Sequence, residues 1–103
     1  MGRLLDALDR LRLWDSTVVV LIGDNGYLLG ERGGYWGKGI PYEESCAVPM
    51  LIAAPGMARG RGCRAVVELL DLYPTLVDLC GLPSPPGLEG RSLTPLLENP
   101  DVA

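Results

Sequence analysis

The chain has 103 residues, of which 48% are hydrophobic and 21% charged, so it belongs with globular rather than disordered sequences. Its net charge of −4 comes from 13 acidic and 9 basic residues without a basic stripe, which argues against nucleic acid as a partner. Histidine is absent, so the usual neutral-pH acid or base and the usual transition-metal ligand are excluded from this chain. Its chemistry must rest on carboxylates, amides, lysine or arginine.

The cysteines and the apolar segments place further limits on the class of protein. Cys46, Cys63 and Cys80 are an odd number at wide spacings, which fits neither a disulfide framework nor a zinc knuckle, so we expect free thiols or small apolar fillers. No apolar stretch approaches the roughly 20 residues that span a bilayer. Charges interrupt the apolar part of the first residues, so no signal peptide is expected in this chain, and its localisation stays unknown.

A helix followed by a strand is predicted at the start of the chain. Leu4, Leu8 and Leu11 fall on one helical face together with Leu5, which predicts an amphipathic helix over residues 3–13. Residues 17–22 are a continuous apolar run of mostly β-branched side chains, typical of a strand buried on both faces. This order favours an α/β fold.

The middle of the chain is predicted to be a long loop, a second strand and an exposed connection. Residues 23–41 contain seven glycines and therefore predict a loop that turns often or approaches something closely. Residues 48–54 are an apolar run with a proline near its start, where a strand tolerates one. The arginine-rich residues 57–64 are expected to be exposed.

The last third of the chain predicts a second helix and little other regular structure. Residues 71–80 have apolar positions at helical spacing, with Pro74 in the first turn and Gly81 suited to cap the C-terminus. Three prolines and two glycines make residues 82–90 irregular, and residues 93–98 fit one short helical turn.

The sharpest candidate for chemistry is the segment Gly-Asp-Asn-Gly at residues 23–26, directly after the first predicted strand. Ligands of open α/β sheets bind beyond the carboxyl ends of strands. The carboxylate of Asp24 and the amide carbonyl of Asn25 are adjacent hard oxygen donors, the type that calcium and magnesium prefer. Asp-Asn-Gly is also a common turn sequence, and two donors do not complete a calcium site, which takes about six to eight. Both interpretations stay open on these residues alone.

Other polar residues have a similar double interpretation. Lys38, the only lysine, lies between two glycines and is either an anion clamp in a pocket or an ordinary solvated side chain. Glu43 and Glu44 offer further metal oxygens, although paired glutamates ahead of a strand more often cap or face water. Glu31 and Arg32 are adjacent opposite charges that can pair with a substrate or with each other.

Several motifs in order resemble the sulfatase family of the alkaline-phosphatase-like superfamily. Residues 17–33, Thr-Val-Val-Val-Leu-Ile-Gly-Asp-Asn-Gly-Tyr-Leu-Leu-Gly-Glu-Arg-Gly, resemble the family's apolar strand, Asp-Asn-Gly and Leu-Gly-Glu motifs. Residues 36–45, Trp-Gly-Lys-Gly-Ile-Pro-Tyr-Glu-Glu-Ser, are similar to its lysine and Tyr-Glu-Glu-Ser motifs. Residues 70–83 and 88–93 resemble the end of its catalytic domain. The resemblance covers nearly the whole chain.

The resemblance implies a fold, a role for three residues, and a cofactor. Residues 1–103 would be the C-terminal portion of a sulfatase catalytic domain, one incomplete α/β domain with a mainly parallel sheet and flanking helices. Asp24 and Asn25 would be ligands of a divalent cation, usually calcium with magnesium as an alternative, and Lys38 would contact the sulfate group of a sulfate ester substrate. Metal-assisted hydrolysis with electrostatic clamping is the implied chemistry.

The departures from the family pattern limit what the chain does by itself. Arg32 stands where many members have histidine, which leaves the local substrate contacts open. No cysteine lies in a Cys-x-Pro-Ser-Arg motif, the source of the formylglycine nucleophile, so no catalytic residue is expected in this chain and the remainder of the catalytic domain is expected as its partner. A non-catalytic relic or binding module, and a phosphatase or phosphonate hydrolase of the same superfamily, are the alternatives.

Overall fold

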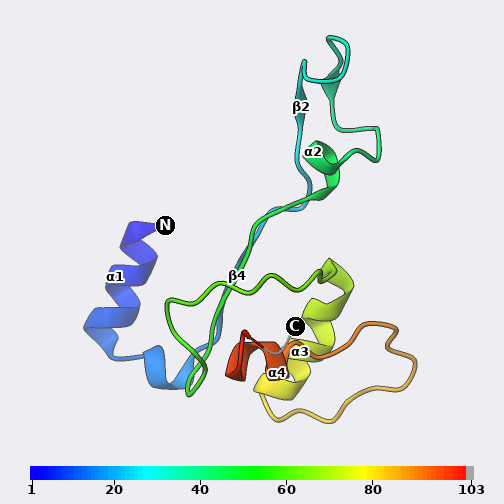
Figure 1. The fold of residues 1–103 in the computed structure, drawn as a ribbon. Coiled ribbons are helices and arrows are strands. Elements are labelled where there is room, and N and C mark those ends of the chain that lie inside the picture. Colours follow the sequence, from blue (N-terminus) through cyan, green and yellow to red (C-terminus); the bar gives the residue numbers. More distant parts are fainter. Residues whose placement is uncertain (102–103) are drawn as a thin grey trace. The chain divides into compact units, whose positions relative to one another are not determined.

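The computed structural model describes residues 1–101, which divide into two compact units (Figure 1). One unit comprises Met1–Val19 and the chain from Ala53 onward, and the other is Val20–Ile52. The helices are α1 (Gly2–Leu11), α2 (Glu43–Cys46), α3 (Leu72–Leu79) and α4 (Thr94–Glu98), with 3-10 turns η1 (Trp14–Ser16) and η2 (Leu69–Asp71). The strands are β1 (Val19–Ile22), β2 (Leu28–Leu29), β3 (Trp36–Gly37) and β4 (Met50–Ala53). None of the helices within residues 1–101 is long and apolar enough to cross a membrane.

In the first unit, α3 and α4 are joined through one buried hydroxyl. The Thr75 side chain is fully buried; its Oγ1 donates to the Asp71 carbonyl at 2.6 Å and accepts the Leu93 N–H at 2.8 Å. At the other end of α3, Gly81 has a φ of 62°, and the Gly81 and Leu82 N–H groups bond to the Asp78 and Val77 carbonyls, as in a Schellman cap. The helix predicted over 71–80 and its glycine cap are therefore confirmed.

A carboxylate organises the turn that precedes α3. The Asp71 side chain accepts the Arg91 N–H at 2.8 Å and the Glu68 N–H at 3.0 Å, so it ties η2 to the irregular segment that leads into α4. These two hydrogen bonds, the one from Arg91 being the larger influence, hold the pKa of Asp71 below its ordinary value. Gly90 is required in the same place, because a Cβ there would collide with the Leu70 carbonyl.

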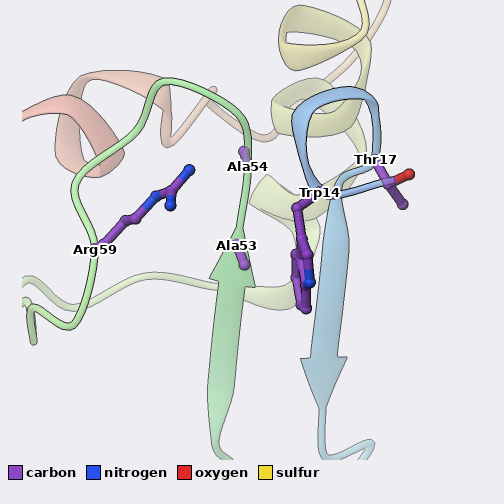
Figure 2. Close-up of a pocket in the computed structure, with 5 residues that line it drawn as sticks. All are labelled: Trp14, Thr17, Ala53, Ala54 and Arg59. Carbon is purple, nitrogen blue, oxygen red and sulfur yellow. The ribbon is translucent and has the colours of Figure 1, made fainter. Parts of the chain in front are cut away.

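The second unit is built from two strand pairs and one short helix. β2 pairs antiparallel with β3, with Leu28 opposite Gly37 and Leu29 opposite Trp36. β1 pairs with β4, and Figure 2 draws the two arrows in opposite directions. One more bond, from the Gly23 N–H to the Pro49 carbonyl at 3.1 Å, continues this pairing to the end of β1. The chain between β1 and β4 thus leaves and returns as one long excursion that contains β2, β3 and α2.

The expected mainly parallel sheet is wrong for these residues. The resemblance to the sulfatase family implied a mainly parallel sheet, but β1 and β4 are joined by an excursion without a long crossover helix, and such a return allows antiparallel pairing. Burial of the first strand on both faces is also wrong, since Leu21 and Ile22 are each 39% exposed. The α/β class itself is confirmed, as are the helices predicted over 3–13 and 93–98 and the strands over 17–22 and 48–54, with bounds that differ by one or two residues.

Candidate functional site

The candidate metal ligands lie in the turn that leaves β1. Asp24 is exposed and Asn25 is partly buried. The Oδ1 atom of Asp24 accepts the Asn25 N–H at 2.9 Å, a local bond of the kind that the turn interpretation expects. A carboxylate has about four lone-pair sites, so this bond leaves the other oxygen available for a cation. The donor types therefore fit calcium or magnesium.

The donors from this turn do not make a complete cation site. Within residues 1–101 no three carboxylate, cysteine or histidine side chains lie close enough together to hold a metal ion. Calcium takes about six to eight oxygen ligands, so most of them would have to come from elsewhere. The sequence predicts Asp24 and Asn25 as a pair of ligands, and among residues 1–101 the structure does not place the Asp24 carboxylate in a group of three ligating carboxylate, cysteine or histidine side chains.

Gly26, the residue after this pair, is held tightly by α2. Its N–H donates to the Ser45 carbonyl at 2.8 Å, and a Cβ at this position would collide with the Glu44 carbonyl oxygen. Only glycine allows this approach. The turn that carries Asp24 and Asn25 is thereby fixed against the backbone of α2, a contact that sequence patterning does not predict because the four-residue helix has no periodicity.

The Arg32 side chain contacts Glu44 of α2 and Tyr42, the residue that precedes α2. The guanidinium Nη2 lies 2.8 Å from Glu44 Oε1, and Nε donates to Glu44 Oε2 at 3.4 Å. The guanidinium carbon also lies 4.9 Å from the centre of the Tyr42 ring, within cation–π range. A hydrogen bond from its own backbone N–H, together with Arg32, lowers the pKa of Glu44 from its ordinary value. Both carboxylate oxygens of Glu44 therefore bind Arg32. Glu31 does not pair with Arg32, and its Oε2 accepts the Leu29 N–H at 2.6 Å.

Lys38 lies next to β3, on backbone that an aromatic ring covers. The Tyr35 hydroxyl lies so close to Gly37 that a Cβ there would be 2.9 Å from it, and it lies 3.6 Å from a Cβ placed at Gly39. Lys38 itself is exposed, and no carboxylate in the described part of the chain forms an ion pair with it. Its ammonium group is therefore available to an anion.

The remaining candidates are separate from this turn. Cys46, Cys63 and Cys80 are exposed free thiols, as the spacing predicts. In the first unit a hollow of about 240 Å³ is lined by Trp14, Thr17, Ala53, Ala54 and Arg59 (Figure 2). It has no carboxylate in its lining and therefore does not offer the oxygen donors of a cation site.

Comparison with known proteins decides the family. The sulfatase family model matches residues 1–82. This chain belongs to the sulfatase family. Human arylsulfatase K is 40% identical over 96 residues, which cover 93% of this chain and 18% of that protein. The chain spans 8% of the length of the extracellular sulfatase SULF-1 homolog of Drosophila melanogaster and 19% of a sulfatase of Formosa agariphila.

Two solved structures show the same fold. One was solved in complex with its substrate, D-glucosamine-2-N,6-O-disulfate; it is 36% identical with a TM-score of 0.86, and the match covers 95% of this chain and 20% of that one. The other, a phosphonate monoester hydrolase from Silicibacter pomeroyi, is 37% identical with a TM-score of 0.88, and the match covers 94% and 19%. The sulfatase resemblance of the motifs is therefore confirmed, and these residues have the fold of the matching part of alkaline-phosphatase-like enzymes.

Proposed function

We propose that this chain is the C-terminal part of the catalytic domain of a metal-dependent sulfuric ester hydrolase. The observation that carries the proposal is the sulfatase match over residues 1–82, which includes Asp24, Asn25 and Lys38 in one 33-residue unit. The small share of each relative that the chain spans supports a part of a larger domain. The remainder of that domain would supply the nucleophile and the missing cation ligands.

In this proposal the chain provides charge and position rather than bond-making atoms. Asp24 and Asn25 would hold a calcium or magnesium ion through side-chain oxygens. The bound cation would supply Lewis-acid stabilisation of negative charge on the sulfate oxygens. Lys38 would place its ammonium against another sulfate oxygen, where it neutralises charge as the ester bond breaks. Gly26 and α2 keep the ligand-bearing turn in place by the contacts described above.

A phosphonate or phosphate ester is the second candidate substrate class. The phosphonate monoester hydrolase fold match supports it, because tetrahedral oxyanions of sulfur and phosphorus are bound by the same cation and ammonium groups. A non-catalytic binding module, which would keep the fold without turnover, is the third alternative. These three functions predict different results in one hydrolysis assay.

The test is a hydrolysis assay of the complete protein that contains this chain, with 4-nitrophenyl sulfate and 4-nitrophenyl phenylphosphonate as parallel probes. We expect faster turnover of the sulfate ester, loss of activity with a chelator, and recovery on addition of calcium. Preference for the phosphonate would replace the proposed substrate class by the second one. No turnover of either probe by calcium-loaded protein that carries an intact formylglycine would favour the binding module.

A further inference from the structure

Arg32, Tyr42 and Glu44 form a three-residue contact, here named the Arg32 clasp. Two nitrogen atoms of the guanidinium face the two carboxylate oxygens of Glu44, at 2.8 and 3.4 Å, and the Tyr42 ring lies 4.9 Å from the guanidinium carbon. A planar guanidinium is suited to such paired bonds and to aromatic contact at the same time. The clasp joins the loop that follows β2 to the start of α2.

The loop that carries Arg32 is itself braced. The Gly34 N–H bonds to the Gly30 carbonyl at 3.1 Å, and the Tyr35 N–H bonds to the Arg32 carbonyl at 3.2 Å. Gly33 and Gly34 have φ values of 64° and 83°, a region that glycine enters without strain. The Arg32 backbone is therefore fixed by a turn, so its side chain presents the guanidinium from a defined place.

Glu44 connects the clasp to the candidate metal ligands. Its carboxylate binds Arg32, while its backbone carbonyl lies against Gly26 and the next carbonyl, of Ser45, accepts the Gly26 N–H. Gly26 directly follows Asn25. α2 has only four residues and no side-chain cap at its N-terminus, so it has little stability of its own and depends on contacts made by its side chains.

From these contacts we propose that Arg32 is a positioning residue: through Glu44 and Tyr42 it holds α2 against Gly26 and so sets the geometry of the Asp24 and Asn25 donors. The inference rests on the proposed function, since it concerns the same cation site. Glu44 engages two of the five N–H groups of the guanidinium, and the Tyr42 ring lies within cation–π range, so in this proposal Arg32 acts through α2 rather than on the sulfate group. Direct sulfate binding, the competing role for a positive charge here, predicts a different kinetic result.

The experiment measures calcium affinity by isothermal titration calorimetry in the complete protein, for Arg32→Met, Glu44→Gln and the double variant. We expect each single variant to weaken calcium binding by about fivefold and the double variant to weaken it no further, because paired residues are not additive. Tyr42→Phe should retain calcium affinity and Tyr42→Leu should lower it. Arg3→Met, which removes an exposed arginine of α1 in the first unit, is the matched control and should change nothing.

Two results would contradict the proposed positioning role of Arg32. One is calcium affinity within twofold of the parent protein for both Arg32→Met and Glu44→Gln. The other is a raised KM for 4-nitrophenyl sulfate at saturating calcium in Arg32→Met but not in Glu44→Gln, which would mean direct sulfate binding. Asp24→Ala separates the two levels of the argument: if it alone abolishes calcium binding, only the clasp fails, and if it binds calcium like the parent protein, the proposed metal site fails.

Discussion

Single residues decide where the candidate ligands stand, and Gly26 is the most constrained of them. Gly26→Ala should lower the free energy of unfolding by about 1–3 kcal/mol, because the new Cβ forces the turn away from the Glu44 carbonyl. Urea unfolding of the complete protein measures this loss. Gly62→Ala is the control, since no atom lies within 4 Å of a Cβ there; equal losses for the two variants would contradict the close approach at Gly26.

Lys38 is predicted to contribute to catalysis and not to the stability of the fold. Because the side chain is exposed and forms no ion pair with the described carboxylates, Lys38→Ala should leave the unfolding free energy unchanged. Its kcat/KM for 4-nitrophenyl sulfate should fall by about a hundredfold, the usual effect of removing one charge-stabilising group from an active site. Lys38→Arg should recover part of the loss. If Lys38→Ala retained full activity, Lys38 would be an ordinary solvated side chain and not a sulfate-binding one.

At the residue scale the sequence identifies the candidate ligands better than it identifies the residues that hold those ligands in place. The chemistry of Asp24, Asn25 and Lys38 is legible from side-chain type and from their place after a strand. The roles of Gly26 and Arg32 depend on α2, which brings residues 12 to 19 positions away against them, and no local pattern encodes such contacts. The sequence shows that Arg32 departs from the family pattern, but it does not predict that Arg32 pairs with Glu44.

Among the elements, the link between α3 and α4 depends on Thr75. Thr75→Val keeps the shape but leaves the buried Leu93 N–H without an acceptor, so it should cost about 1–3 kcal/mol of unfolding free energy. Thr75→Ser retains the hydroxyl and should keep that hydrogen bond. Chemical unfolding of the complete protein compares the two, and equal stability of parent and Thr75→Val proteins would show that the N–H finds another partner.

The turn before α3 should make the protein sensitive to acid. Hydrogen bonds from the Arg91 and Glu68 N–H groups lower the folded-state pKa of Asp71 below its unfolded value of about 4. A lowered folded pKa means a stabilisation that is present above the unfolded pKa and is lost as pH falls through the folded pKa. Asp71→Asn should therefore narrow the stability difference between pH 7 and pH 3, and Asp15→Asn, at an exposed position, should not. Parallel pH profiles for Asp71→Asn and the parent would contradict this role.

Elements with an apolar run, helical spacing or a cap signal were predictable, and β2, β3 and α2, which have none of these, were not. The helix over 71–80 has both apolar spacing and a glycine cap, two independent signals that agree. β2 and β3 have two residues each and show no period, so residues 23–41 indicated only a loop; α2, with four residues, gave no helical signal over residues 43–46. Strand direction was wrong because the apolar runs specify strands but say nothing of how the glycine-rich segment between them returns.

For the whole molecule, exposed apolar surface bears on whether this chain is sufficient for a stable fold. Leu51 is 57% exposed and Val66 is 99% exposed, in addition to Leu21 and Ile22 of β1. We expect the isolated 103-residue chain to show no cooperative thermal transition by circular dichroism, because uncovered strands and apolar faces leave its core incomplete. The complete protein should melt cooperatively. A sharp transition in the isolated chain would favour an independent binding module.

The most direct test of the central claim is the calcium-dependent kcat/KM of Asp24→Ala in the complete protein with 4-nitrophenyl sulfate. Asp15→Ala, which removes another exposed carboxylate, is the control and should retain the parent activity. If Asp24 is a cation ligand of a sulfuric ester hydrolase, its variant should lose at least about a thousandfold, since the cation stabilises the reacting charge. Activity within a few-fold of the parent would contradict the assignment of Asp24 and, with it, the site on which the proposed function depends.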